Sequence, residues 1–405
     1  MDICTIRDYA QAFSGYAFSS EDLVDAGHPV LKIGNIQNHH ILKETDSYYC
    51  KSITDRLKKY QFRKDDFLIA MTGAGSVGRA GKMIDFEEGY LVNQRVAIIR
   101  PDLSKTDPDY LFYYFSMGYV EKYLYNLGIG AGQPNISAND ILKTKVSFPK
   151  LTKQKRIGEI LSAYDTLIEN NNKRVKLLEQ MAENIYKEWF VRFRFPGCET
   201  AEFENGFPKN WEQIRLGEKM TFIRGKSYSS ADIQDGDKIL LSMNSIRPYG
   251  GFIRDFTRVY GGKYQDKHVI KYGDLIMSIT DMTQDRRIIG YVGMFDSNRT
   301  DCIMSTHLMK IETPIDHHFI LNFFNVSGLS KMIAEFATGA NVLGLTDSIL
   351  IRIKAVLPPN DLIEQYGKSV KPYYDMIAVL KNKNDNLIKQ RDLLLPRLMS
   401  GKLEV

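Results

Sequence analysis

The sequence predicts an α+β protein. Two α/β modules, related by a pseudo-twofold repeat, are separated by two long helices that form an antiparallel intramolecular coiled coil. Three observations predict this architecture. The chain repeats itself with a period of about 210 residues, each copy begins with short strand-like runs, and each copy ends in a long helical pattern of apolar residues. A chain of 405 residues is long enough for several domains, each with a core of its own.

The repeat is clearest where similar residues recur in register. Gly15 to Leu23 aligns with Gly225 to Ile233, and Tyr164-Asp165 aligns with Tyr374-Asp375. Because the register barely drifts between these segments, two copies of one unit account for the whole chain.

Residues 1–150 and 196–358 are the predicted modules. They are rich in Gly, Tyr, Phe and β-branched residues, in short runs such as Phe67 to Met71, which predict strands and turns. A helix is expected to interrupt each module, over about 108–125 and about 316–336, where the apolar spacing becomes helical.

Residues 151–195 and 359–405 are the predicted spacer helices, and each begins just after a proline. Heptad spacing relates Ile157, Ile160, Tyr164, Leu167, Asn171, Leu178, Met181 and Ile185 in the first helix, and Val370, Tyr373, Ile377, Leu380, Asn384, Leu387, Leu394 and Leu398 in the second. Such stripes can also pack onto the chain's own modules. Two equivalent helices, each with one Asn in its stripe, favour pairing with each other, because a buried Asn fixes register.

Several enzyme motifs are absent or out of context. Gly73 to Gly78 fits G-x-G-x-x-G, but the residues after it predict a strand instead of a helix, so these glycines indicate a hairpin tip. Gly81-Lys82 is followed by Met83, which excludes a phosphate-binding P-loop. No acid is followed two residues later by lysine, and neither N-P-P-Y nor D-P-P-Y occurs, so common nuclease and adenine-methyltransferase motifs are missing.

Metal-site and membrane signals are also missing. The four cysteines are far apart and form no C-x-x-C pair, which predicts inert thiols. The adjacent pairs His39-His40 and His317-His318 cannot place both rings on one helical face, and we interpret them as surface loop residues. No apolar run approaches the roughly 18 residues of a membrane span, and the N-terminus does not resemble a signal peptide, so a cytoplasmic location is expected and no metal is predicted.

The module loops carry residues suited to reading DNA grooves. Arginine pairs with guanine, Asn and Gln pair with adenine, and lysine holds phosphates, while the formal charge of +5 permits such contacts without requiring them. The predicted DNA-binding residues are polar side chains in these loops: Lys32, Asn35, Gln37, Arg79, Asn93, Gln94, Arg95, Gln133, Asn135, Lys226, Asn244, Arg247, Arg286, Arg287, His307 and Asn341.

Two helical segments bring a resemblance to a known family. Pro149 to Ile157 and the stretch from Ile185-Tyr186 to Phe193 resemble the central spacer of Type I restriction-modification specificity subunits, and Gln390 to Leu403 resembles that family's C-terminal signature. The modules match more weakly, for example at Gly132 to Ser137.

The resemblance implies a non-catalytic subunit whose two target-recognition domains each read half of a split double-stranded DNA sequence, with the helices setting the gap. It implies two adenine-methyltransferase subunits and two restriction or translocase subunits as partners. S-adenosylmethionine, ATP and Mg²⁺ are expected in those partners, and no cofactor in this chain. The predicted partner-binding residues lie on the spacer helices: Ile157, Tyr164, Leu178, Trp189, Phe190, Leu394 and Leu398.

Two other hypotheses remain open at this point. One is a stand-alone nuclease or methyltransferase with a degenerate site, against which the missing motifs argue. The other is a coiled-coil scaffold whose modules bind protein. The salt dependence of DNA binding distinguishes a DNA-binding protein from a protein scaffold. Phosphate contacts make DNA affinity fall steeply as the salt concentration rises, and a protein scaffold lacks this dependence.

Overall fold

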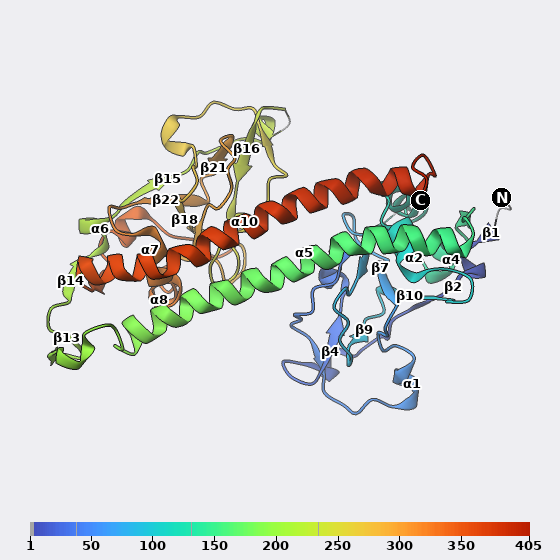
Figure 1. Cartoon of the computed structure of the whole chain (residues 1–405), viewed down its shortest axis with the longest axis horizontal. Helices are drawn as coiled ribbons and strands as arrows, with labels where there is room; N and C mark the ends of the chain where they lie inside the picture. Colours follow the sequence, from blue (N-terminus) through green and yellow to red (C-terminus); the bar gives the residue numbers. More distant parts are fainter. Residues whose placement is uncertain (1–3, 38, 131, 234) are drawn as a thin grey trace. The chain divides into compact units, whose positions relative to one another are not determined.

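The computed structural model describes residues 4–37, 39–130, 132–233 and 235–405, which form two compact units. Unit 1 comprises Met1–Asn171 with Lys383–Val405, and unit 2 comprises Asn172–Asn382. Each unit therefore contains one module and part of both long helices, α5 (Leu151–Tyr186) and α10 (Asn360–Met399), which Figure 1 shows in green and red.

The described residues of unit 1 form three small sheets and four short α-helices. The five-stranded sheet has the order β2-β10-β7-β8-β5 and is antiparallel except for the β5–β8 pair. Its strands are β2 (Ala10–Ser14), β10 (Val96–Pro101), β7 (Phe67–Ala70), β8 (Ala80–Lys82) and β5 (His39–His40). The other sheets pair β3 (Leu23–Val24), β6 (Tyr48–Tyr49), β4 (His28–Leu31) and β9 (Leu91–Val92) in that order, and β1 (Cys4–Thr5) with β11 (Lys145–Val146). The helices are α1 (Asp55–Lys58), α2 (Pro108–Phe115), α3 (Gly118–Leu127) and α4 (Ala138–Leu142).

Unit 2 has an antiparallel four-stranded sheet of order β15-β22-β18-β20 and smaller sheets beside it. The strands of the main sheet are β15 (Thr221–Arg224), β22 (Leu308–Glu312), β18 (Leu275–Ser278) and β20 (Val292–Met294). The smaller sheets are β17 (Val259–Tyr260), β16 (Lys238–Leu241) and β21 (Cys302–Met304); β14 (Glu212–Arg215) and β24 (Lys354–Leu357); β12 (Phe203–Glu204) and β13 (Phe207–Pro208); and β19 (Thr280–Asp281) and β23 (Leu343–Gly344). The helices are α6 (Leu216–Lys219), α7 (His317–Asn325), α8 (Leu329–Ala334) and α9 (Asp347–Leu350).

The two modules share one topology, which confirms the predicted repeat. The order β2-β10-β7-β8 in unit 1 matches β15-β22-β18-β20 in unit 2. Among the described residues, each sheet is followed by a helix pair (α2 and α3, or α7 and α8), a short third helix (α4 or α9) and then a long helix. Alternate residues of the central strands are buried on opposite faces, so each sheet separates two apolar cores, as expected for strands covered on both sides.

The prediction of one helix in each of these segments is wrong, because the described residues form two consecutive helices there. In unit 1 the chain breaks at Ser116 and Met117 between α2 and α3, and in unit 2 it breaks before α8 at Gly328, whose φ is +89°. In unit 2 the left-handed Gly328 ends the helical path even though the apolar spacing continues through it, whereas in unit 1 Met117 is extended, with φ of -73°.

The long helices pair antiparallel, as predicted. In unit 1, Ile157 of α5 and Leu398 of α10 share a core, and Asn171 Nδ2 donates a hydrogen bond of 2.8 Å to Asn384 Oδ1. The two asparagines predicted to interrupt the stripes therefore bond directly to each other. In unit 2, Tyr366 Oη of α10 donates to the carbonyl oxygen of Ala182 in α5 at 3.2 Å.

The predicted heptad stripe of α5 is wrong at two positions. Leu167 and Met181 are 52% and 46% exposed, while Asp165, Val175 and Ala182 are buried. A straight helix has 3.6 residues per turn, so its buried face drifts by about 20° per heptad away from a strict 3.5-residue pattern.

Close helix–module contacts recur in both units. A Cβ added to Gly158 of α5 would lie 2.3 Å from Asp107 Oδ1, and one added to Gly367 of α10 would lie 2.6 Å from Asp316 Oδ2. Asp107 and Asp316 each cap the first module helix, α2 or α7. The same glycine-to-cap contact thus anchors a long helix to its module twice.

The structure also settles two sequence interpretations. Gly73 to Gly78 lie in the connection between the antiparallel strands β7 and β8, which confirms the hairpin. The surface-loop interpretation is wrong for His39, which is in β5 with a buried Nδ1. It is also wrong for His318, which lies in the first turn of α7 and packs against Tyr374 in a tilted arrangement with ring centroids 4.9 Å apart. Adjacent histidines on a strand face opposite sides, so one can be buried while the other is exposed. Across the residues that the structure describes, no helix is long and apolar enough to span a membrane, and no cluster of potential metal ligands occurs.

Candidate nucleic-acid interface

A network of backbone hydrogen bonds gathers the predicted DNA-binding loops of unit 1 around one turn, residues 93–95. Asn93 N donates to the carbonyl of Leu31 at 2.9 Å, Gln94 N to that of Tyr16 at 2.9 Å, and Met71 N to that of Arg95 at 3.1 Å. Ile136 N in turn donates to the carbonyl of Met71 at 2.9 Å, which adds the loop that carries Gln133 and Asn135.

Unit 2 repeats this network around residues 305–307. Ser305 N donates to Leu241 at 2.9 Å, Thr306 N to Lys226 at 2.8 Å, Ile279 N to His307 at 3.0 Å and Leu345 N to Ile279 at 2.9 Å. His307 therefore occupies the backbone position that Arg95 occupies in unit 1. The backbone hydrogen bonds around the turn are thus the same in both units, while the side chains that the turn carries differ.

Aromatic rings beside cationic side chains flank each turn. In unit 1 the guanidinium of Arg56 lies 5.9 Å from the Tyr16 ring centroid, and Tyr16 packs edge-on to Phe18 at 5.0 Å. In unit 2 the guanidinium of Arg258 lies 6.0 Å from the ring of Tyr228. None of these five residues was among the sequence predictions, because each cation and the ring it faces are far apart in sequence.

Eight of the predicted residues are exposed: Gln94, Arg95, Gln133, Asn135, Asn244, Arg247, Arg287 and Asn341. Lys32, Gln37, Arg79, Asn93, Lys226, Arg286 and His307 are half-buried. In the unit 2 loops the arginines have acidic partners: Arg247 pairs with Glu179 at 2.9 Å, and Arg286 pairs with Glu335 at 2.6 Å.

Asn35 has a different role from the one its residue type suggested. It is 8% exposed, its Oδ1 accepts from Lys32 N at 2.9 Å, and its Nδ2 donates to the carbonyls of Leu42 and Glu44 at 3.1 and 2.9 Å. The amide therefore shapes its loop instead of presenting itself to a base. Ser245, at the equivalent place, accepts from Ser242 N in the same way.

His307 is held by its neighbours. Its Nδ1 lies 3.1 Å from Thr280 Oγ1 and its ring centroid 6.3 Å from that of Tyr228. Burial lowers the pKa of His307 below its usual value, so the ring is neutral at pH 7 and carries one donor and one acceptor.

The predicted partner-binding residues differ in exposure. Ile157, Phe190 and Leu398 are 1%, 7% and 1% exposed and pack in the chain's own cores, so they offer no surface in this structure. Tyr164, Leu178, Trp189 and Leu394 are half-buried. Trp189 and Phe190 lie in a π-helical turn, Lys187–Val191, that follows α5.

Comparison with known proteins links this arrangement to one family. Residues 1–180 match the model of the type I restriction modification DNA specificity domain. The chain is 22% identical to the putative type I restriction enzyme MjaX specificity subunit of Methanocaldococcus jannaschii, over 100% of this chain and 94% of the relative. It is 21% identical to the type I restriction enzyme HindI specificity subunit of Haemophilus influenzae, over 92% of this chain and 94% of that relative. The crystal structure of a Type-I restriction-modification system S subunit from M. genitalium shares the fold, with a TM-score of 0.53, 14% identity and coverage of 98% and 96%.

Proposed function

We propose that the chain is a specificity subunit of a type I restriction-modification system and that each unit reads one half of a bipartite DNA target. The repeated backbone network carries this proposal. It supports one turn in unit 1 and its equivalent in unit 2, surrounded in each case by the same loops. A framework built twice, with different side chains on it, suits two different half-sites.

The exposed loop residues are the proposed base readers. Arg95 and Gln94 in unit 1 suit guanine and adenine edges respectively, whereas the neutral His307 makes unit 2 read a different pattern. Arg56 and Arg258, held over aromatic rings, are proposed phosphate contacts.

The chemistry is proposed to reside in partner subunits, and this chain to be non-catalytic. The missing phosphate-loop, nuclease and adenine-holding motifs support this division. Two methyltransferase subunits with S-adenosylmethionine and two restriction or translocase subunits with ATP and Mg²⁺ are the proposed partners, in the cytoplasm where the DNA lies. The repeat itself suits a pair of identical partners.

Exchange of one module tests the proposal. Residues 1–150 are replaced by the corresponding module of another specificity subunit, the chain is co-expressed with its methyltransferase subunits, and methyladenine is mapped across the host genome. One half of the methylated sequence is expected to change. Arg95→Ala is expected to relax one position in that same half, since a bidentate pair contributes about 1 to 3 kcal/mol of discrimination.

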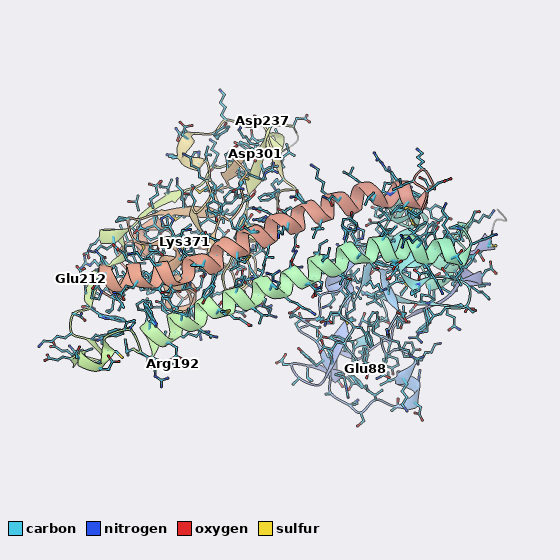
Figure 2. The ribbon with its side chains drawn as sticks, viewed as in Figure 1. Glu88, Arg192, Glu212, Asp237, Asp301 and Lys371 are labelled. Carbon is cyan, nitrogen blue, oxygen red and sulfur yellow. The ribbon has the colours of Figure 1, made fainter. Side chains whose placement is uncertain are left out.

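The matched control is Lys371→Ala, on an exposed face of α10 (Figure 2), which should leave the methylated sequence unchanged. A change in both halves after the exchange would show that the modules do not read independently.

A further inference from the structure

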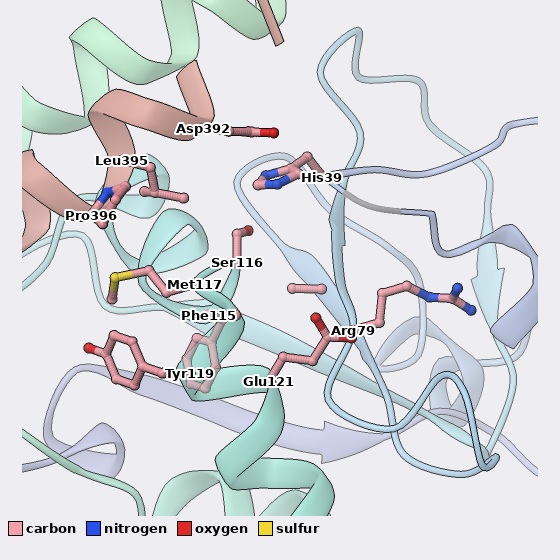
Figure 3. Close-up of a pocket in the computed structure, with 12 residues that line it drawn as sticks. His39, Arg79, Phe115, Ser116, Met117, Tyr119, Glu121, Asp392, Leu395 and Pro396 are labelled. Carbon is pink, nitrogen blue, oxygen red and sulfur yellow. The ribbon is translucent and has the colours of Figure 1, made fainter. Parts of the chain in front are cut away.

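Unit 1 contains a pocket of about 470 Å³, and Arg79 is the one predicted DNA-binding residue among the side chains that line it. Strand β5, the corner between α2 and α3, and the last turns of α10 form its walls. Figure 3 shows the side chains around it, among them His39, Ser116, Met117, Glu121, Asp392 and Leu395.

The corresponding place in unit 2 holds larger side chains. Tyr249 replaces His39 with nearly the same left-handed backbone, φ +66° against +69°. Tyr291 replaces Arg79 after an equivalent left-handed glycine and packs edge-on to Tyr249 at 5.9 Å. The two units therefore share the backbone around this place, but smaller side chains leave a pocket in unit 1.

The third difference is at the end of the first module helix. Ser116 is the C-cap of α2, whereas Asn325 is the last residue of α7. The Asn325 amide accepts from Val292 N at 3.0 Å and donates to the Val292 carbonyl at 2.8 Å. A Cβ added to Gly250 would lie 2.4 Å from that amide, so Asn325 packs tightly against the loop that carries Tyr249.

The ionised groups around the pocket leave a net negative charge. Arg391 lies between Asp165 and Asp392, and the guanidinium of Arg79 extends away from His39 and Leu395 in Figure 3. With Glu121, these are three carboxylates against two guanidinium groups.

The remaining features are an apolar wall and two buried polar atoms without a hydrogen-bond partner among the described residues, His39 Nδ1 and Arg79 Nε. Burial lowers the pKa of the His39 imidazole to about 4, so it is uncharged at pH 7. Phe115, Met117 and Leu395 are buried and line the pocket, and Tyr119, 65% exposed, stands at its edge.

We propose that this pocket binds a side-chain-sized organic cation, a guanidinium or ammonium group on a short aliphatic stem. The carboxylates of Glu121 and Asp392 attract the cationic head, and the apolar wall packs the stem. Such a group is carried both by an arginine or lysine of a partner subunit and by a free small molecule.

Ligand-observed saturation-transfer NMR on the full chain tests the proposal with Nα-acetylated arginine amide as the probe, called arginine amide below, because acetylation leaves the guanidinium as its only charge. Nα-acetylated citrulline amide, which has nearly the same shape without that charge, is the matched control ligand, called citrulline amide. Arginine amide is expected to bind at least tenfold more tightly. Equal binding of the two amides, or binding of neither, would overturn the proposal.

Variants taken from unit 2 test the location. His39→Tyr and Ser116→Asn insert the residues that the shared scaffold already accommodates, so both are expected to fold and to abolish binding; thermal unfolding checks the fold. Glu121→Gln is expected to weaken binding at least tenfold, whereas Glu88→Gln, an exposed acid of the same unit (Figure 2), leaves it unchanged. Binding that survives both filling variants would place the ligand elsewhere and refute the site.

Addition of the methyltransferase subunits distinguishes the two sources of the cation. Release of arginine amide on assembly identifies a partner side chain as the occupant, and retention in the complex identifies a free small cation.

Discussion

The Asp165 and Arg391 side chains are charged groups buried where two helices meet, 4% and 7% exposed. Tyr113 Oη also donates to Asp165 Oδ2 at 2.5 Å, so the carboxylate depends on groups from α10 and α2 together. In the low dielectric of such a site, loss of one partner leaves a charge with no adequate solvation.

Arg391→Met is therefore expected to lower the free energy of unfolding of unit 1 by about 3 to 5 kcal/mol. Urea denaturation measures the change. Lys371→Met, which removes an exposed pair with Asp375 on the same helix (Figure 2), is the control and should cost less than about 1 kcal/mol. Equal effects of the two substitutions would mean that the buried pair contributes no more than a surface one.

His39 gives unit 1 a pH dependence of known sign. Burial and the nearby Arg391 lower its pKa from 6.5 to about 4, so the unfolded chain binds a proton more readily than the folded chain between these values. The contribution to stability is fully present above pH 6.5 and is lost progressively as the pH falls toward 4. Unfolding measured from pH 7.5 to 4.5 should show a smaller slope for His39→Gln than for the wild type, and identical slopes would contradict the buried neutral imidazole.

At the scale of elements, the contact between each long helix and its module is set by one glycine. Gly158→Ala places a methyl group 2.3 Å from Asp107 Oδ1, the atom that caps α2 by accepting from Tyr110 N at 2.8 Å. Although alanine favours helices by about 1 kcal/mol over glycine, the clash pushes the cap away and should dominate.

Gly158→Ala is thus expected to lower the thermal stability of unit 1, followed by circular dichroism. Gly118→Ala in α3, where nothing lies within 4 Å of the added methyl, is the control and should be neutral or stabilising. If Gly158→Ala were also stabilising, helix propensity would outweigh the packing of α5 on α2.

Elements governed by local pattern were predictable, and those governed by distant contacts were not. The asparagine pair of the helix seam, Asn171 and Asn384, followed from spacing alone and is confirmed by their hydrogen bond. The break at Gly328 was missed because apolar spacing continues through it, and backbone conformation is not visible in that spacing.

The candidate site shows the same division. Clustering of the loops followed from the repeat, but the role of Asn35 did not, since an Asn that closes a turn and one that reads a base look alike in sequence. The pocket could not be predicted, because Asp392 and His39 are far apart in the chain.

At the scale of the whole molecule, we propose that the spacer helices set the number of unread base pairs between the two half-sites of the DNA target. Each long helix is divided between the two units. The boundary lies between Asn171 and Asn172 on α5 and between Asn382 and Lys383 on α10. One heptad inserted at both places leaves the Asn171–Asn384 pair inside unit 1 and every contact of unit 2 intact.

The double insertion lengthens both helices by about 10 Å, because each residue adds about 1.5 Å. Since DNA rises about 3.4 Å per base pair, methylation mapping is expected to show an unread gap longer by at most about three pairs, with both half-sites unchanged. Three pairs also rotate one half-site by roughly 100°, whereas a heptad turns its helix by only about 20°, so bending or a smaller increase must absorb the difference. The same heptad in α5 alone is the control: it puts the seam out of register and should abolish methylation. An unchanged gap after the double insertion, or altered half-site bases, would show that the helices do not set the spacing.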